Sequence, residues 1–413
     1  MKKKVLLISQ GFYPEIGSAG NRMKNIFQLL QLEGYEVEAL TTEPTYPNKN
    51  LYRDEKFWNE EALNNNPSIK RVKIKNRKYS TSIFNRLIYY MEMAIRLLFF
   101  IIKDKEKYDF ILVSSPPIFV GFVGLIAKIR YKRKLILDIR DLWPESLKGV
   151  GVFNYKIIIG FFSLLEKGLY RYSDYIIVNS LEFKEYICKN TSVLPSKIGF
   201  MPNSARLGEI PDKQSVSRDG KIKVIYTGNI GLAQDIDVLK ELALQLRKEN
   251  IDLSIVGYGM KKPELVEFVK LNQLTNVHFY SPVTRLECFK INMNHDIGFV
   301  SLNEQEVFNT VLPGKIVDYM TCRLPIVASV SGYAKKVIEE EKVGFVSESR
   351  NSKEIINYIL HLSKHPDLRK QMAENEGRYI MEKFLWEDNI NVLTNIFEEI
   401  NYKQNNTVSG VVE

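Results

Sequence analysis

The stretch Val307-Phe-Asn-Thr-Val-Leu-Pro-Gly-Lys-Ile-Val-Asp-Tyr-Met320 joins a polar turn to an apolar helical pattern. Proline suits the first turn of a helix, and Gly314 lets backbone N–H groups approach a ligand closely. The unpaired N–H groups at the helix start, the helix dipole and the ammonium of Lys315 all favour a bound anion such as a diphosphate. Asp318 follows one turn later, where its carboxylate can accept hydrogen bonds from a ribose diol. The stretch therefore predicts a binding site for a nucleotide-sugar.

On both sides of this stretch, short β-branched strands alternate with amphipathic helices along the chain. Near-continuous apolar strands separated by helices indicate parallel sheets covered on both faces, so the predicted fold class is α/β. The strand candidates are residues 5–9, 37–41, 110–113, 135–138, 175–178, 223–227, 253–256, 277–279, 297–301, 326–328 and 345–346. A chain of 413 residues with 45% apolar residues is long enough for two domains of this kind.

The polar, turn-rich residues 205–221 separate two such series of strands and helices, and we interpret them as a linker. We expect an N-terminal domain over residues 1–205 and a second domain over 206–378. A helix is expected over 379–403, followed by a polar tail over 404–413 that frays.

The net charge of +9 is carried by the N-terminal half, because residues after 210 are slightly acidic. A basic half indicates an anionic partner, such as anionic lipid, a lipid diphosphate or nucleic acid. The chain has no motif typical of nucleic-acid binding, so no nucleic-acid partner is expected. Three scattered cysteines form no disulfide or metal pattern, which favours a reducing cytoplasm.

Three segments of the basic half are unusually apolar, namely residues 83–102, 118–129 and 157–165. In the first, Glu92 and Arg96 disfavour a membrane-spanning helix. A core helix and a helix that lies in a membrane interface both fit the pattern. The basic runs 70–78 and 131–134 would suit anionic headgroups.

The first strand is followed by Gly11-Phe-Tyr-Pro-Glu-Ile-Gly-Ser-Ala-Gly-Asn-Arg22, just before a helix expected over residues 21–32. Small residues at such a turn let backbone N–H groups face a ligand. The spacing is not that of a dinucleotide-binding fingerprint, and a tight structural turn is the alternative. The candidate acceptor or phosphate loop consists of Gly17, Ser18, Gly20 and Arg22.

Several strands of the second half also end in small-residue turns, for example Ile225-Tyr-Thr-Gly-Asn-Ile-Gly231 and Val256-Gly-Tyr-Gly-Met260. Ligands of open α/β sheets bind beyond the carboxyl ends of the strands, although each turn alone also fits a purely structural role. The candidate donor-binding residues are Gly228, Asn229, Gly231, Gly257, Tyr258, Pro282, Val283, Thr310, Leu312, Pro313, Gly314, Lys315 and Asp318.

Charged residues follow the apolar strand in Lys134-Leu-Ile-Leu-Asp-Ile-Arg-Asp-Leu-Trp-Pro-Glu-Ser146. We interpret Arg140, Asp141 and Glu145 as candidate catalytic residues, and a structural ion pair between arginine and aspartate is the alternative. Asp235-Ile-Asp237 has the spacing of a metal-binding DxD motif, but it opens an amphipathic helix, where acidic residues suit the first turn.

With these motifs, the chain resembles family 4 glycosyltransferases, which have a GT-B fold of two Rossmann-like domains with parallel sheets. The resemblance covers nearly the whole chain. Within the family, the chain is most similar to the bacterial branch that transfers N-acetylated amino sugars, such as L-fucosamine, in surface polysaccharide synthesis. The segments that carry it are residues 137–146, 226–231, 255–259 and 311–320.

The resemblance implies a UDP-sugar bound mainly by the C-terminal domain and a lipid-linked glycan, on polyprenyl diphosphate, bound by the N-terminal domain. It implies retention at the anomeric carbon in a cleft between the domains, and no metal or other cofactor. It also implies that the last helix returns to the N-terminal domain, and the helix that contains Trp386 fits that part. The products of such enzymes include capsule, O-antigen and exopolysaccharide. The expected location is the cytoplasm, peripheral at the inner face of the bacterial plasma membrane.

The family's paired glutamates, which contact the transferred sugar and the ribose, are replaced here by Thr310 and Asp318. Its phosphate-binding cations fall near Asn229 and Gln234, neither of which is charged. Lys315 must then supply more of the positive charge, together with Arg22.

Asp141 lies nearest the position of a histidine that many family members carry. We expect it to orient or deprotonate the acceptor hydroxyl, while the turns around residues 228–231 and 313–315 stabilise the leaving diphosphate. A UDP-sugar 2-epimerase of the same fold and a non-catalytic protein that docks on membranes are the competing hypotheses.

Overall fold

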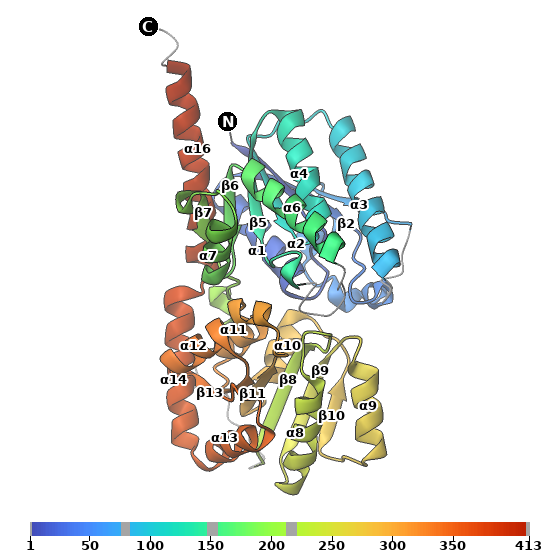
Figure 1. Ribbon diagram of the computed structural model, residues 1–413, viewed down its shortest axis with the longest axis vertical. Coiled ribbons are helices and arrows are strands. Elements are labelled where there is room, and N and C mark those ends of the chain that lie inside the picture. Colours follow the sequence, from blue (N-terminus) through green and yellow to red (C-terminus); the bar gives the residue numbers. More distant parts are fainter. Residues whose placement is uncertain (1, 76–82, 147–155, 212–220, 410–413) are drawn as a thin grey trace. The chain divides into compact units, whose positions relative to one another are not determined.

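The computed structural model describes residues 2–75, 83–146, 156–211 and 221–409, which form two compact units (Figure 1). The first unit contains the described residues up to Pro202 together with those from Trp386 onward. The second unit is Asn203–Leu385. The observed division at Pro202 and Leu385 differs from the expected boundaries at 205 and 378. Residues 212–220 of the expected linker lie outside the described residues.

The first unit is built on a seven-stranded parallel sheet in the order β3-β2-β1-β4-β5-β6-β7. The strands are β1 Lys4–Ile8, β2 Glu36–Thr42, β3 Ile69–Val72, β4 Phe110–Ser115, β5 Lys134–Ile139, β6 Tyr175–Val178 and β7 Ile198–Phe200. The sequence did not predict the two edge strands, because β3 is only partly buried and β7 has three residues with a glycine in the middle.

The helices of the first unit cover both faces of this sheet. They are α1 Ser18–Leu32, α2 Glu61–Asn64, α3 Ile83–Lys103, α4 Ile118–Tyr131, α6 Lys156–Tyr172, α7 Leu181–Asn190, α15 Trp386–Asn389 and α16 Asn391–Ser409. Short 3-10 turns are Lys49–Arg53, Glu55–Phe57 and Pro195–Lys197. Side chains of α1 and α16 share one buried cluster with alternate residues of β1 and β4, among them Val5, Leu7 and Phe110.

The single helix expected over residues 379–403 is interrupted between Lys383 and Trp386, but the residues from Trp386 onward belong to the first unit, as the resemblance implies. Helix α14 (Pro366–Lys383) belongs to the second unit, while α15 and α16 belong to the first. In the first unit Phe397 of α16 stacks on Phe110 of β4, with ring centroids 4.1 Å apart. The expected tail from residue 404 is also corrected, since α16 continues to Ser409.

The second unit has a six-stranded parallel sheet in the order β10-β9-β8-β11-β12-β13. Its strands are β8 Lys223–Asn229, β9 Asp252–Tyr258, β10 Val277–Tyr280, β11 Ile297–Ser301, β12 Ile326–Ser329 and β13 Gly344–Val346. Its other helices are α8 Ile236–Lys248, α9 Lys262–Leu271, α10 Arg285–Asn292, α11 Gly314–Thr321, α12 Gly332–Glu340 and α13 Ser352–Lys364, with 3-10 turns η4 Leu207–Glu209 and η5 Glu306–Thr310.

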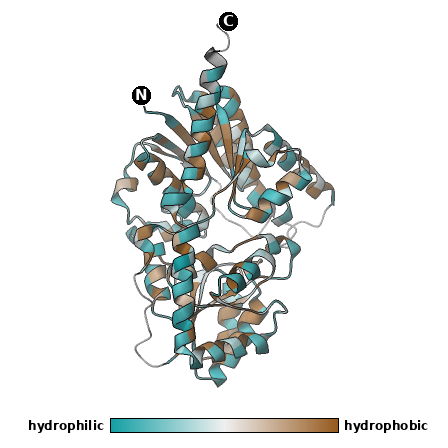
Figure 2. Cartoon of the chain, turned by 90° about the vertical axis from the view of Figure 1, so that its left-hand side faces the viewer, coloured by the Kyte–Doolittle hydropathy of each residue, from teal (hydrophilic) through white to brown (hydrophobic). Residues whose placement is uncertain are grey.

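Buried hydrophobic clusters lie on both faces of the second sheet, because adjacent residues of β8 such as Val224 and Ile225 belong to different clusters. In both units hydrophobic strands lie beneath helices of mixed polarity (Figure 2). The two Rossmann-like domains with parallel sheets that the sequence predicts are confirmed.

The apolar helix expected over residues 83–102 has both a buried face and an exposed face. One stripe of α3 is buried and contains Tyr89, Met93, Leu97 and Ile101. Another stripe of the same helix is exposed. Within the described residues, no helix is long and apolar enough to cross a membrane.

Candidate active site

In the second unit, β8 and β9 end side by side in glycine-containing turns. Gly228 has a positive φ of 103°, and a Cβ at Gly257 would lie 2.0 Å from the carbonyl oxygen of Gly228. The backbone N–H of Gly231 donates to Oε1 of Gln234 at 2.8 Å, so the turn is closed by its own side chain. Glycine at these positions lets two strand ends remain close at the carboxyl edge of the sheet.

Helix α11 begins at Gly314 with Pro313 as its N-cap, and no side chain caps its first N–H groups. The Nζ of Lys315 is buried without a hydrogen-bond partner among the described residues. It lies 3.8 Å from the centroid of the Tyr226 ring, and a Cβ at Gly228 would be 3.9 Å from it. Lys315 thus extends from the start of α11 toward the turn that follows β8.

Burial lowers the pKa of Lys315 to about 7, and the carboxylate of Asp318 acts in the opposite direction. A buried ammonium without hydrogen bonds is unfavourable because its lost hydration is not replaced. An anion between the start of α11 and the β8 turn would supply both charge and acceptors.

Asp318 is held by an arginine that the sequence analysis did not single out. Its Oδ1 accepts from Nη1 of Arg285 at 2.7 Å, and Nε of Arg285 donates to Oε1 of Glu209 at 2.8 Å. The guanidinium also packs on the ring of Phe289, 4.3 Å from its centroid. Burial raises the pKa of Asp318, while Arg285 acts to lower it. Asp318 is therefore oriented by a partner.

The remaining candidate donor residues lie in neighbouring connections. Pro282 and Val283 belong to the turn between β10 and α10, and Tyr258 is the last residue of β9. Thr310 ends η5, and its Oγ1 donates to the carbonyl of Val307 at 2.7 Å. Leu312 follows Thr310 and packs against the core of this unit.

In the first unit, α1 begins at Ser18, three residues earlier than expected, with Gly17 as its N-cap at a φ of 110°. A Cβ at Gly20 would lie 2.1 Å from the carbonyl oxygen of Glu15, so the loop requires glycine for close packing. These contacts support a tight turn.

Arg22 is fully buried in the interior of the first unit. Its Nη2 donates to Oδ1 of Asp138 at 2.7 Å, and its Nη1 donates to the carbonyl of Pro202 at 3.2 Å. Oδ2 of Asp138 also accepts from Ser114 at 3.0 Å. The structure therefore corrects the phosphate role expected for Arg22, and the alternative of a structural arginine–aspartate pair applies to Asp138.

Asp141 is the candidate base whose environment brings its titration near neutrality. Burial raises its pKa to about 6, while hydrogen bonds from Ser146 and from the backbone of Leu142, and the charge of Arg140, oppose the rise. Arg140 donates from Nε to Oγ of Ser114 at 2.8 Å. Arg140 also donates from Nη2 to the carbonyl of Pro116 at 2.6 Å, so its side chain is held close to Asp141.

Two further buried carboxyls of the first unit were not predicted. Burial raises the pKa of Glu15 to about 7, although its Oε1 accepts from the backbone N–H groups of Thr45 and Tyr46 at 2.9 and 2.7 Å. Burial also raises the pKa of Glu166 to about 8, and the candidate Glu145 adds to this rise through its charge. An acidic residue inside the glycine loop is the signal that could have identified Glu15.

The Asp235-Ile-Asp237 motif opens helix α8, as the sequence favoured. The Asp235 side chain accepts from the N–H groups of Asp237 and Val238, each at 3.1 Å, at the start of α8. Among the described residues there is no group of three or more His, Cys, Asp or Glu side chains placed to hold a metal ion.

Residues 209–378 match the family of glycosyl transferases group 1. The colanic acid biosynthesis glycosyl transferase WcaI of Escherichia coli K12 is 22% identical over 348 residues, which cover 80% of this chain and 84% of that protein. The chain is a glycosyltransferase. An alpha-D-kanosaminyltransferase of Streptomyces kanamyceticus is 26% identical over 207 residues, which cover 48% of this glycosyltransferase and 50% of the kanosaminyltransferase.

Solved structures share the fold of this glycosyltransferase. A sucrose-phosphate synthase from Thermosynechococcus elongatus superposes with a TM-score of 0.74 at 14% identity, covering 97% of this chain and 100% of that one. HepE from Anabaena, in complex with UDP-glucose, gives a TM-score of 0.65 at 14% identity over 98% and 99% of the two chains. The fold is therefore GT-B.

The glycosyltransferase is expected to lose about 3–5 kcal/mol of stability when Asp138 is changed to asparagine. The substitution leaves the Arg22 guanidinium buried without its counter-charge, since both side chains are 0% exposed. Denaturant unfolding measures the loss. Asp174→Asn is the matched control, because Asp174 pairs with partly exposed Lys128 and Lys134. Equal effects of the two substitutions would contradict the structural role of the Arg22–Asp138 pair.

Proposed function

We propose that this glycosyltransferase moves a sugar, an N-acetylated amino sugar, from a UDP-sugar to a lipid-linked glycan on polyprenyl diphosphate in bacterial surface polysaccharide synthesis. It is of the family 4 type and acts with retention at the anomeric carbon, without a metal. The observation that carries this proposal is the buried Nζ of Lys315 beside the start of α11, which has no hydrogen-bond partner among the residues that the structure describes. A diphosphate is the anion that fits a buried ammonium and free helix N–H groups.

Similar proteins support the proposed donor and the proposed role in polysaccharide synthesis. HepE is a structural neighbour in complex with UDP-glucose, which supports a UDP-sugar donor. The name of WcaI supports an assembly role in polysaccharide synthesis, and that of the kanosaminyltransferase supports an amino sugar. The group 1 match covers most of the second unit, which includes Lys315 and Asp318.

In the proposed reaction the bond between the sugar's anomeric carbon and the diphosphate breaks, and a bond to the acceptor oxygen forms. Negative charge develops on the diphosphate, where Lys315 and the first N–H groups of α11 would stabilise it. Asp141 would orient the acceptor hydroxyl, and its proton would pass to Asp141 or to the departing diphosphate. Asp318, held by Arg285, would accept hydrogen bonds from the ribose.

The acceptor implies a location. A polyprenyl diphosphate is embedded in a membrane, and the first unit carries most of the positive charge together with exposed apolar side chains on α3 and α6. We therefore place the enzyme at the inner face of the plasma membrane as a peripheral protein.

The decisive experiment incubates the protein with a panel of UDP-sugars, with and without a polyprenyl-diphosphate glycan. Mass spectrometry identifies the extended glycan, and proton NMR of the new linkage gives its anomeric configuration. A UDP-sugar converted without the lipid would favour the 2-epimerase instead. Failure to bind any uridine nucleotide would favour a non-catalytic protein.

Replacing Arg285 with methionine is expected to reduce the preference of the protein for UDP over 2′-deoxy-UDP. Asp318 would lose the guanidinium that orients it and lowers its pKa. Calorimetric titration with both nucleotides measures the ratio of Kd values, which should fall toward that of Asp318→Asn. Arg247→Met on α8 serves as a control, because this arginine donates to the backbone carbonyl of Asn272. A preference that survives in Arg285→Met would rule out this orienting role.

A further inference from the structure

Helix α3 of the first unit presents a continuous apolar stripe to solvent. The stripe, called here the α3 stripe, consists of Ile88, Met91, Ile95, Phe99 and Ile102. At 3.6 residues per turn these positions lie within about 80° of one another around the helix axis. Ile95 is 62% exposed and Phe99 58%, so the stripe is a surface feature opposite the buried side of the helix.

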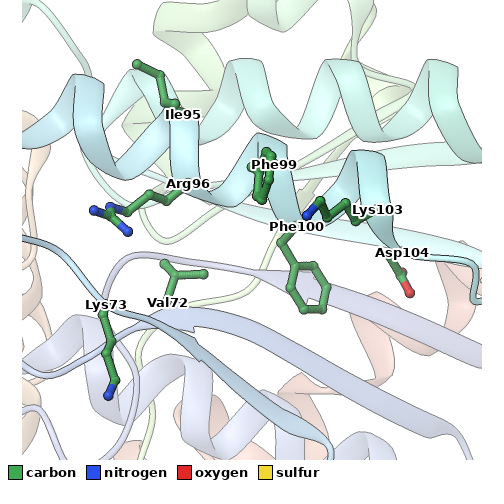
Figure 3. A pocket seen from close by; sticks show the side chains of 8 residues that line it. All are labelled: Val72, Lys73, Ile95, Arg96, Phe99, Phe100, Lys103 and Asp104. Carbon is green, nitrogen blue, oxygen red and sulfur yellow. The ribbon is translucent and has the colours of Figure 1, made fainter.

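A pocket of about 590 Å³ opens between α3 and the end of the edge strand β3 (Figure 3). Two members of the α3 stripe, Ile95 and Phe99, form part of its wall, so the pocket and the stripe are one continuous surface. The lining residues are Val72, Lys73, Ile95, Arg96, Phe99, Phe100, Lys103 and Asp104. The pocket therefore joins hydrocarbon side chains to several cations.

The cations at this pocket are only partly neutralised. Arg96 pairs with Glu92 at 2.7 Å, but neither Lys73 nor Lys103 forms an ion pair within the part of the chain that the structure describes. Nζ of Lys103 lies instead 4.1 Å from the centroid of the Phe99 ring. The one lining carboxylate, that of Asp104, accepts hydrogen bonds from the hydroxyls of Tyr108 and Tyr131, at 2.9 and 2.7 Å. Positive charge at the pocket is thus available to a ligand.

We propose that the α3 stripe lies in the surface of a membrane and that the pocket binds an anionic phospholipid from it. A hydrocarbon chain would contact Ile95, Phe99 and Phe100, and the phosphate would meet Lys73 and Lys103. This inference rests on the proposed function, because a lipid-linked acceptor requires contact with a membrane. Apolar side chains flanked by unpaired lysines are typical of helices that lie in an anionic interface.

Helix α6 of the same unit also exposes apolar side chains to solvent. Ile157, Phe161 and Leu164 are exposed on it, and Ile157 and Leu164 are 88% and 70% exposed. Helices α3, α4 and α6 follow one another along the same side of the sheet (Figure 1). A membrane surface would cover such separate apolar stripes together, whereas a narrow ligand would not.

The test is co-sedimentation of the full chain with vesicles of phosphatidylcholine, either alone or mixed equally with phosphatidylglycerol. We expect binding to the anionic vesicles and a partition coefficient reduced about tenfold by Phe99→Glu. Reversing the charges of Lys73 and Lys103 together, as K73E/K103E, should reduce the partition coefficient about tenfold or more. Leu271→Glu, at a leucine 75% exposed on α9, and the double change K248E/K270E are matched controls expected to change it less than twofold.

Entry of a chain into the pocket has its own readout. In Phe100→Trp, the new tryptophan should be quenched by phospholipids with brominated acyl chains more than the native tryptophans are. Absence of this additional quenching would overturn the pocket assignment. Equal vesicle binding by the wild type, Phe99→Glu and K73E/K103E would overturn the docking surface.

Titration with UDP in solution separates this inference from the proposed function. Each surface variant should keep the wild-type Kd for UDP, because the changes lie on α3 and beside β3, in the first unit. If the wild type bound UDP but did not bind the anionic vesicles, the membrane-docking proposal would be refuted and the proposed function would stand. Vesicle binding without uridine nucleotide binding would refute the proposed function and leave the membrane surface standing.

Discussion

Replacing Asp141 with asparagine is expected to reduce sugar transfer about 100-fold or more while leaving the Kd for UDP within about twofold. Asparagine keeps the shape of the side chain but cannot take a proton from the acceptor. Asp141 lies in the first unit, whereas the proposed donor-binding side chains Lys315 and Asp318 lie in the second, so the substitution changes neither of them. Transfer is measured as extended glycan per unit time under saturating UDP-sugar.

The pH dependence gives a second readout for Asp141. Because burial raises its pKa to about 6, the carboxylate that accepts a proton becomes populated as pH rises through that value. Transfer should therefore increase from pH 5 to pH 7. A hydrogen bond from Ser146 opposes the rise in pKa, so Ser146→Ala should raise the pKa further and move the acidic limb to higher pH.

Glu15 is the appropriate control, because it is another buried carboxyl of the first unit, with a pKa raised to about 7. Its carboxylate already accepts from the N–H groups of Thr45 and Tyr46, which suits a role in holding the loop. We expect Glu15→Gln to retain more activity than Asp141→Asn. Full transfer by Asp141→Asn, with loss in Glu15→Gln, would move the role of base to Glu15.

Changing Lys315 to methionine is expected to weaken UDP binding about 10- to 100-fold, the range for a hydrogen bond to a charged group. The same substitution should raise the melting temperature of the ligand-free protein. The reason is that Nζ is buried without a partner in the described residues, and methionine fills similar space without a charge to desolvate. A variant that is more stable but binds UDP poorly distinguishes a ligand-binding lysine from a structural one.

The ionisation of Lys315 makes both properties depend on pH. Its folded-state pKa, about 7, is below that of the unfolded chain, near 10.5, so the unfolded chain binds more protons between these values. The ligand-free wild type should therefore gain stability relative to Lys315→Met as pH rises from 7 to 10. UDP affinity should fall over the same range, because binding to the charged form requires uptake of a proton.

Calorimetric titrations in buffers of different ionisation enthalpy would count that proton. Lys315→Met should show no such uptake and a UDP affinity nearly independent of pH above 7. Lys335→Met is a matched control, since Lys335 is a surface lysine of α12 paired with Glu348. An unchanged Kd for UDP in Lys315→Met would remove the main support for the donor site.

The strands show what local sequence determines. Runs such as Val5–Ile8 and Ile326–Ala328 are continuously buried and β-branched or aliphatic, so their pattern predicts the central strands of two parallel sheets. The edge strands β3 and β7 were not predicted, because an edge strand has fewer buried neighbours and therefore a weaker pattern. The bounds of the single C-terminal helix expected over residues 379–403 were wrong for a related reason. The residues near 385 are helical on both sides, and only packing assigns them to different units.

The candidate site divides in the same way. The sequence by itself determined the fold class, the glycine turns and the helix start at Pro313–Lys315, because strand periodicity and turn chemistry depend on neighbouring residues. Only the tertiary structure decided which charges are free. Arg22 pairs with Asp138, 116 residues away, and Asp318 pairs with Arg285, while Nζ of Lys315 is buried with no hydrogen-bond partner in the described part of the chain. Partners so far apart in the chain meet only when the sheets form, and burial then sets the cost of each charge and hence its role.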